Sequence, residues 1–171
     1  RKTLLVFGGS RGARSINRAL GAALPELLSD MQVIHLSGEL DWPEVQAARQ
    51  ALPDSLRAHY YAFPYLHNRE MGEALAAADL VVARAGASAL GEFPLFGLPA
   101  VLVPYPYAWR YQKVNADYLA TRGAAVRLND EDLGRELVPL VRGLLSDTPR
   151  LSRMREASRA LAAPEAARRI A

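Results

Sequence analysis

The sequence predicts an α/β domain of the Rossmann-like, three-layer type, with a six-stranded parallel sheet between two layers of helices. Three observations favour this class. Short apolar runs alternate with amphipathic stretches along almost the whole chain, as in repeated β–α–β units. Several runs are apolar at every position, which is typical of strands buried on both faces. The 171 residues match the size of one domain, so we treat residues 1–171 as a single unit.

The elements of the first half follow from periodicity and from the residues that end each run. In order, we expect a strand over 3–7, a helix over 15–28, a strand over 31–36, a helix over 42–52, a strand over 59–63 and a helix over 69–78. Pro43 fits the first turn of the second helix, and Asn68 is expected to cap the third.

The second half continues the same alternation. We expect a strand over 80–83, a helix over 90–96, a strand over 100–103, a helix over 111–121, a strand over 124–128, and helices over 131–145 and from 149 onward. Gly97 and Gly123 are expected to end the helices before them. Because ligands of parallel sheets bind beyond the carboxyl ends of the strands, the segments 8–13, 63–68, 84–88 and 104–112 should share one edge.

Composition excludes several kinds of site. The chain has no cysteine, which rules out disulfides and thiolate ligands, and its three histidines are scattered, so we expect no metal site. A net charge of +3 is too small to indicate nucleic-acid binding. Prolines interrupt the longest uncharged stretch, 93–109, so we expect no membrane-spanning helix. The arginines after residue 141 indicate either a solvated helix face or contact with an acidic partner or membrane surface.

The segment Gly8-Gly9-Ser10-Arg11-Gly12-Ala13 joins a predicted strand to a predicted helix. Glycines allow backbone N–H groups to approach an anion, and a helix N-terminus adds partial positive charge. The spacing matches neither a Walker loop nor a dinucleotide fingerprint. A tight turn without a ligand is the alternative interpretation.

A second small-residue turn, Arg84-Ala85-Gly86-Ala87-Ser88, leads into the helix that contains Glu92. The Glu92 carboxylate either accepts hydrogen bonds from a sugar diol or complements the helix dipole. Two helix N-termini at one edge, with an acidic residue near, favour a nucleoside diphosphate as the ligand.

The third segment is stiffened by Pro104 and Pro106 and leads into a predicted helix with Gln112 and Asn115 on one face. Amide side chains both donate and accept, as the recognition of sugar hydroxyls requires. The aromatic residues of this loop, Tyr105, Tyr107 and Trp109, would either stack on a ligand or pack in the core.

These three segments, in this order and at this spacing, resemble the MurG family, with Asn115 followed by Ala116 as in its members. That family transfers N-acetylglucosamine from UDP-N-acetylglucosamine (UDP-GlcNAc) to lipid I in bacterial peptidoglycan synthesis. The resemblance implies a GT-B glycosyltransferase, of which this chain would be the C-terminal, donor-binding half. Because Arg1-Lys2-Thr3 leads directly into a strand without an initiator Met, we expect a piece cut at a domain boundary.

The resemblance also implies site residues. The diphosphate would contact Gly9, Ser10, Arg11 and the backbone of Ala87, Ser88 and Ala89, and Arg84 would orient the turn. Tyr65 and the Leu66 backbone would bind uracil, and Glu92 would bind the ribose. Gln112 and Asn115 would bind the N-acetylglucosamine hydroxyls. Tyr111 stands where many members have His or Gln.

The implied reaction is an inverting transfer that converts lipid I to lipid II without a metal or cofactor. The general base and the site for undecaprenyl-linked lipid I would lie in an N-terminal domain before Arg1. The chain alone would then bind UDP-GlcNAc weakly and transfer nothing, and the whole enzyme would be cytoplasmic, bound peripherally to the inner face of the membrane. Two other interpretations stay open: another UDP-sugar enzyme of GT-B-like fold, including UDP-GlcNAc 2-epimerase, and a nucleotide-sugar-binding module that needs a partner chain.

Overall fold

The computed structural model describes residues 1–9, 13–108 and 110–165. Its sheet is parallel, with six strands in the order β3-β2-β1-β4-β5-β6. The strands are β1 (Lys2–Phe7), β2 (Met31–Leu36), β3 (Tyr60–Phe63), β4 (Leu80–Ala83), β5 (Ala100–Leu102) and β6 (Ala125–Arg127). The predicted fold class is therefore confirmed, including the number of strands and their common direction.

The helices alternate with the strands along the described part of the chain. They are α1 (Arg14–Leu27), α2 (Trp42–Ala51), α3 (Asp54–Arg57), α4 (Asn68–Ala77), α5 (Ala89–Phe96), α6 (Tyr111–Thr121), α7 (Leu133–Ser146) and α8 (Thr148–Ala160), with a 3-10 turn, η1 (Asp130–Asp132), before α7. None of the helices described in the structure is long and apolar enough to cross a bilayer.

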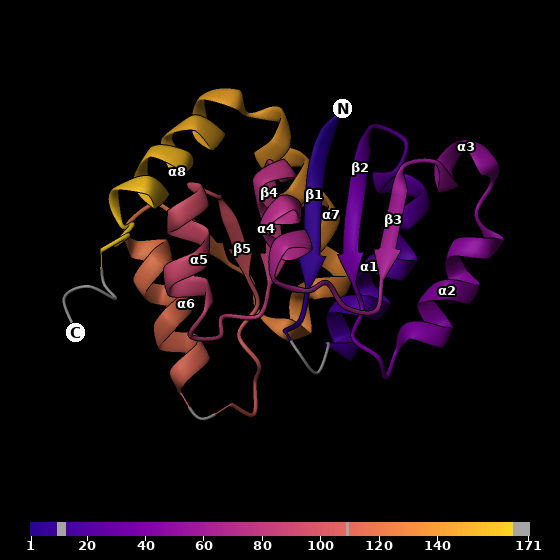
Figure 1. Ribbon diagram of the computed structural model, residues 1–171, viewed down its shortest axis with the longest axis horizontal. Helices are drawn as coiled ribbons and strands as arrows, with labels where there is room; N and C mark the ends of the chain where they lie inside the picture. The colour runs from indigo at the N-terminus through magenta and orange to yellow at the C-terminus, as the bar shows by residue number, and fades with distance from the viewer. Residues whose placement is uncertain (10–12, 109, 166–171) are drawn as a thin grey trace.

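Two apolar clusters, one on each face of the sheet, form the core. Alternate residues of the central strands face opposite layers, so Leu4 packs with α1, α2 and α7, whereas Leu5 packs with α4, α5 and α6. Both residues are fully buried, as all four residues of β4 are. Figure 1 shows α4 and α5 in front of the sheet and α1 and α7 behind it. The three-layer arrangement thus fixes the strand ends, and the loops that follow them, on a rigid frame.

Some element ends differ from the sequence-based expectation. Asn68 is the first residue of α4 and not its cap; the cap is His67, whose backbone N–H donates to the Glu70 carboxylate at 3.3 Å. Glu70, in the first turn, thus satisfies the backbone N–H of the cap residue, as in a capping box. The four-residue helix α3 was not predicted. Gly97 (φ +59°) and Gly123 (φ +80°) end their helices as predicted, in the left-handed conformation.

The arginines late in the chain have mixed roles in the described residues. Arg142 pairs with Glu26 at 2.8 Å and joins α7 to α1, whereas Arg155 pairs with Asp79 at 2.8 Å and joins α8 to the residue before β4. Arg150 and Arg153 are exposed on α8, as expected for a solvated helix face. Arg168 and Arg169 lie outside the described residues.

Candidate functional site

A cavity of about 690 Å³ opens beyond the carboxyl ends of β1, β4 and β5, and we call it the edge cavity. It is lined by Phe7, Gly8, Gly9, Ala13, Arg14, Ser15, Arg84, Gly86, Ser88, Ala89, Phe93, Tyr105, Pro106, Tyr107, Gln112 and Asp130. Three of the four segments predicted to share this edge of the sheet contribute to the lining. The volume is in the range of small-molecule sites.

The turn after β1 forms one wall of the edge cavity. Gly9 adopts φ +94°, a conformation that L-residues rarely reach, so glycine is required for the chain to leave the strand in this direction. Helix α1 then begins after Ala13, without a side-chain cap and without an acidic residue in its first turn. Its N-terminus therefore keeps its partial positive charge. The predicted residues Ser10 and Arg11 lie outside the described residues.

The turn after β4 forms the opposite wall and leads into α5, whose N-cap Ser88 makes no side-chain cap bond. The N–H of Ala89 donates to the Gly86 carbonyl at 3.1 Å, within the turn. The N–H groups of Ala87 and Ser88 have no partner among the described residues, and both residues are exposed. These two N–H groups are therefore available to bind an anion.

Arg84 lies at the centre of the polar network beneath the edge cavity. Its guanidinium donates to the Val103 carbonyl at 3.2 Å and to Ser15 Oγ at 2.8 Å, and it pairs with Asp130 Oδ1 at 2.5 Å. Asp130 also accepts from Ser15 Oγ at 2.7 Å. Because the Arg84 side chain is only 9% exposed and its charge is compensated, it can position the strand ends and α1 more readily than contact a ligand.

A second cation, Arg14, lines the edge cavity with a side chain that is 62% exposed. Its Nε donates to Asp41 Oδ1 at 3.1 Å, which leaves the two terminal nitrogens without a partner among the described residues. Asp41 is held in turn by Asn17 Nδ2 at 2.8 Å. Arg14 is therefore a charged group that is oriented by the protein and still accessible from the cavity.

The Asp41 network continues into the core through His35. Asn17 Oδ1 can only accept, so His35 Nε2, 2.9 Å away, donates to it, and His35 Nδ1 accepts from the Tyr60 hydroxyl at 2.7 Å. This tautomer is neutral. Burial lowers the pKa of His35 to about 4, against a smaller opposing effect of Asp41, and burial raises the pKa of Tyr60.

The amides of α6 lie on the same side of the site. Gln112 lines the edge cavity, and its Oε1 accepts from the Tyr105 backbone N–H at 2.8 Å. Its amide nitrogen has no partner among the described residues and can donate to a ligand. Asn115 Nδ2 donates to the Ala85 carbonyl at 2.9 Å and so connects α6 to the turn after β4. Asn115 is not part of the cavity lining.

The structure brings some of the predicted residues together and leaves others outside the lining. Gly9, Arg84, Ser88, Ala89 and Gln112 line one cavity, whereas Ala87, Asn115, Glu92, Tyr65 and Leu66 do not. Glu92 is half-buried in the first turn of α5. The segment with Tyr65 and Leu66 runs back along the carboxyl ends of β2 and β1 (Figure 1), where the Pro64 carbonyl accepts from Gly38 N–H at 3.0 Å.

Sequence reasoning missed Arg14, Asp41 and Asp130. Asn17 could have indicated the first two, because it is a polar residue on the apolar face of the predicted helix and, being buried, needs polar partners. Nothing local marked Asp130, which meets Ser15 and Arg84 only through the fold. No group of three or more acidic or histidine side chains in the described part of the chain is arranged to hold a metal ion.

Comparisons with known proteins show the family of this chain. The model of the glycosyltransferase family 28 C-terminal domain matches residues 3–170. The chain is 47% identical over 188 residues, 99% of its length, to UDP-N-acetylglucosamine--N-acetylmuramyl-(pentapeptide) pyrophosphoryl-undecaprenol N-acetylglucosamine transferase of Roseiflexus sp. (strain RS-1), and covers 42% of that protein. It is 43% identical over 171 residues, 96% of its length, to the protein of the same name from Desulforamulus reducens, and covers 45% of it.

A solved structure gives the same result. The crystal structure of Acinetobacter baumannii MurG superposes with a TM-score of 0.83 at 30% identity, over 98% of this chain and 48% of that one. The chain thus spans less than half the length of the curated relatives above. From the family match over residues 3–170 and these similarities, the chain belongs to the glycosyltransferase family 28 C-terminal domains and, within them, to the MurG family.

Proposed function

We propose that this chain is the UDP-GlcNAc-binding domain of an N-acetylglucosaminyltransferase that converts lipid I to lipid II. The observation that carries the proposal is that the N-termini of α1 and α5, neither with a side-chain cap, open into one cavity. Free N–H groups and the partial positive charge of a helix N-terminus favour a phosphate ligand. The names of the relatives supply the donor sugar and the acceptor.

Each wall of the site has a part in this proposal. The diphosphate lies between the turn after β1, with Gly9 and by family resemblance Ser10 and Arg11, and the N–H groups of Ala87 and Ser88. Arg14 adds a cation that Asp41 orients at 3.1 Å. Arg84 positions both turns through Ser15 and Asp130.

The remaining residues bind the two ends of the donor. Glu92 accepts from the ribose hydroxyls, Tyr65 and the Leu66 backbone hold uracil, and Gln112 donates its amide N–H to a hydroxyl of N-acetylglucosamine. Asn115 contributes to the sugar end of the site through its contact with Ala85, which fixes the turn beside the sugar.

In the proposed reaction the acceptor hydroxyl attacks the anomeric carbon as the bond from that carbon to the diphosphate oxygen breaks. UDP leaves with the bonding electron pair, and a general base takes the proton of the hydroxyl. The described chain stabilises the charge that develops on the leaving group through α1, α5 and Arg14, because dipoles and cations already aimed at that position need no reorganisation. The base and the lipid I site are assigned to another part of the full-length enzyme, which acts at the cytoplasmic face of the membrane without a metal or cofactor.

Calorimetric titration of the chain with UDP-GlcNAc, UDP-GalNAc, UDP-glucose and NADH tests this proposal. We expect saturable binding of UDP-GlcNAc with a lower Kd than for the other two UDP-sugars, and none for NADH. Binding of NADH without binding of any UDP-sugar would refute the assignment. An epimerase is tested in the same samples, because it would convert UDP-GlcNAc to its 2-epimer, which ¹H NMR detects.

A further inference from the structure

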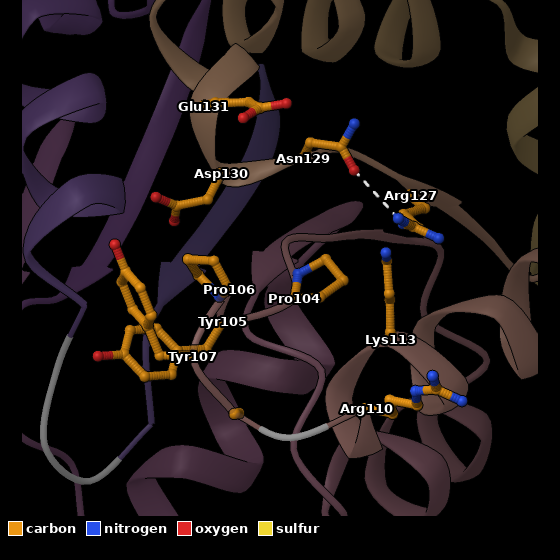
Figure 2. A pocket seen from close by; sticks show the side chains of 11 residues that line it. Pro104, Tyr105, Pro106, Tyr107, Arg110, Lys113, Arg127, Asn129, Asp130 and Glu131 are labelled. Atoms are coloured by element: carbon orange, nitrogen blue, oxygen red, sulfur yellow. Dashed lines mark hydrogen bonds between the residues drawn. The ribbon is translucent and has the colours of Figure 1, made fainter.

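Two tyrosines of the loop after β5, Tyr105 and Tyr107, line the edge cavity and have no assigned role in donor binding. They are 46% and 83% exposed. Both also line a neighbouring pocket, and in Figure 2 their rings lie together along one side of it, across from Lys113. Because a soluble domain seldom leaves neighbouring apolar rings open at a cavity without a use for them, this pair is a candidate contact for a ligand.

The backbone that carries Tyr107 is a closed turn. The carbonyl of Tyr105 accepts from the N–H of Ala108 at 3.2 Å, so residues 105–108 form a four-residue turn. Pro106 occupies its second position, where the fixed φ of proline already suits a turn. Tyr107 is therefore presented by a backbone that needs little further ordering when a ligand binds, which lowers the entropic cost of the contact.

Tyr105 is held by contacts on several sides and supports the ring of Tyr107. The guanidinium carbon of Arg84 lies 5.2 Å from the centroid of the Tyr105 ring, within the range of a cation–π contact. The backbone N–H of Tyr105 donates to Gln112 Oε1 at 2.8 Å. The rings of Tyr105 and Tyr107 meet edge to face, with centroids 5.6 Å apart and planes at 71°. Tyr105 is thus a supporting residue, and Tyr107 keeps most of its ring surface open.

The order of the strands indicates which part of the donor would reach Tyr107. The segment assigned to uracil runs along the carboxyl ends of β2 and β1, and the two turns assigned to the diphosphate follow β1 and β4. The next strand in the sheet is β5, and the turn with Tyr107 follows it. A donor that lies across this edge of the sheet therefore brings its sugar, and not its base, to Tyr107 and Gln112.

We propose that the ring of Tyr107, positioned by Tyr105, packs against the C–H face of the donor's pyranose ring and determines how much affinity the sugar adds to that of UDP. The face of an aromatic ring is electron-rich, so it disfavours a phosphate and attracts the weakly positive C–H groups of a sugar. Gln112 binds the hydroxyl rim of the same ring. The inference rests on the proposed function, because it takes the edge cavity to hold the diphosphate and Gln112 to mark the sugar.

The test measures the affinities of the 171-residue chain for UDP and for UDP-GlcNAc by calorimetry. The variants are Tyr107→Ala, which removes the ring, and Tyr107→Phe, which keeps the ring and removes only the hydroxyl. The matched control is Tyr118→Ala, because Tyr118 is another exposed tyrosine and lines neither the edge cavity nor the neighbouring pocket. One-dimensional ¹H NMR of bound UDP-GlcNAc adds a second readout, since protons that lie over an aromatic ring shift upfield.

We expect Tyr107→Ala to raise the Kd for UDP-GlcNAc about fivefold or more, as the loss of an aromatic contact implies, and to leave the Kd for UDP within about twofold. Tyr107→Phe should recover most of the affinity for UDP-GlcNAc, because the ring makes the contact. Tyr118→Ala should change neither Kd by more than about twofold. The C–H protons of the sugar should shift upfield on binding to the unsubstituted chain and to Tyr107→Phe, and not on binding to Tyr107→Ala.

Three results would overturn the inference. One is an unchanged Kd for UDP-GlcNAc in Tyr107→Ala, and another is an equal loss of affinity for UDP and UDP-GlcNAc in that variant. The third is a loss in Tyr107→Phe as large as in Tyr107→Ala, which would assign the contact to the hydroxyl. An unsubstituted chain that binds neither UDP nor UDP-GlcNAc would instead refute the proposed function itself, so the two failures are distinguishable.

Discussion

Nη1 of Arg84 lies 2.5 Å from Oδ1 of Asp130, and this pair joins the end of β4 to the turn after β6 directly beneath the edge cavity. Ser15 of α1 contacts both partners, through Nη2 of Arg84 at 2.8 Å and Oδ1 of Asp130 at 2.7 Å. One network thus fixes three elements that line the site.

Replacing Asp130 with Asn should destabilise the fold, because it leaves the largely buried Arg84 guanidinium without its counter-charge. We expect the free energy of unfolding to fall by about 1–3 kcal/mol in urea denaturation, with weaker UDP binding. Asp132→Asn is the control, since Asp132 pairs with the 76% exposed Arg135. This substitution should lower the free energy of unfolding by less than about 1 kcal/mol. Equal losses for the two variants would show that the Arg84 pair has no special role.

Gly9→Ala should weaken UDP binding and lower stability by about 1–2 kcal/mol, because an L-residue is strained at φ +94°. An added Cβ at Gly9 meets no atom within 4 Å, so the cost is one of backbone conformation and not of a clash. Gly21→Ala, in the exposed interior of α1, also meets nothing within 4 Å and should instead stabilise by about 0.5–1 kcal/mol. Thermal unfolding measures both, and a Gly9→Ala protein as stable as Gly21→Ala would be inconsistent with this account of the turn.

Stability should fall as the pH decreases from about 6.5 to about 4, because His35 is buried and neutral. The unfolded chain binds a proton at this histidine near its ordinary pKa of 6.5, whereas the native state binds it only near 4, so protons favour unfolding over this window. His35 contributes on the order of 3 kcal/mol to the free energy of unfolding at pH 7, and this contribution is lost by pH 4.

Urea denaturation at pH 7 and pH 4 measures this effect, with His35→Gln as the test variant and His67→Gln, at an exposed position, as the control. We expect the difference in the free energy of unfolding between pH 7 and pH 4 to shrink in His35→Gln and to persist in His67→Gln. An unchanged difference in His35→Gln would mean that other groups carry the pH dependence.

Glu92 and Gln112 should affect different parts of the donor. Glu92→Ala is expected to weaken UDP and UDP-GlcNAc alike, by about 1.5–3 kcal/mol for hydrogen bonds to a charged group. Gln112→Ala is expected to weaken UDP-GlcNAc by about 1 kcal/mol and to leave UDP unchanged, because Gln112 is assigned to the sugar. Calorimetry measures all four affinities, and if neither variant changes the UDP-GlcNAc affinity, the assignment of these residues is wrong.

The fold could be predicted because its signals are local. The apolar runs within β1, β4 and β5 indicate strands buried on both faces, and the glycines at 97 and 123 end helices through backbone conformation alone. The misplaced cap at Asn68 arose because the competing contact, from His67 to Glu70, depends on side-chain geometry. Helix α3 is too short for periodicity to detect.

The site could be predicted only in part, for the same reason. Gly9 and the turn before α5 are marked by residue type and position, and the structure places both on the edge cavity. Asp130 is separated by 115 residues from Ser15, and no pattern near Asp130 indicates that contact. The family resemblance implied that Arg84 orients the turn, but the partners through which it does so, in four polar contacts, follow only from the fold.

The central claim is that the edge cavity holds the donor diphosphate, and an NMR titration of the ¹⁵N-labelled chain with UDP-GlcNAc tests it most directly. We predict that the amide signals of Gly9, Ala87 and Ser88 shift together with one saturating dissociation constant. Signals of Met31 and Gly143, which line a cavity at the opposite edge of the sheet, should not move. Saturable shifts at Met31 and Gly143 with none at Gly9, Ala87 and Ser88 would contradict the account.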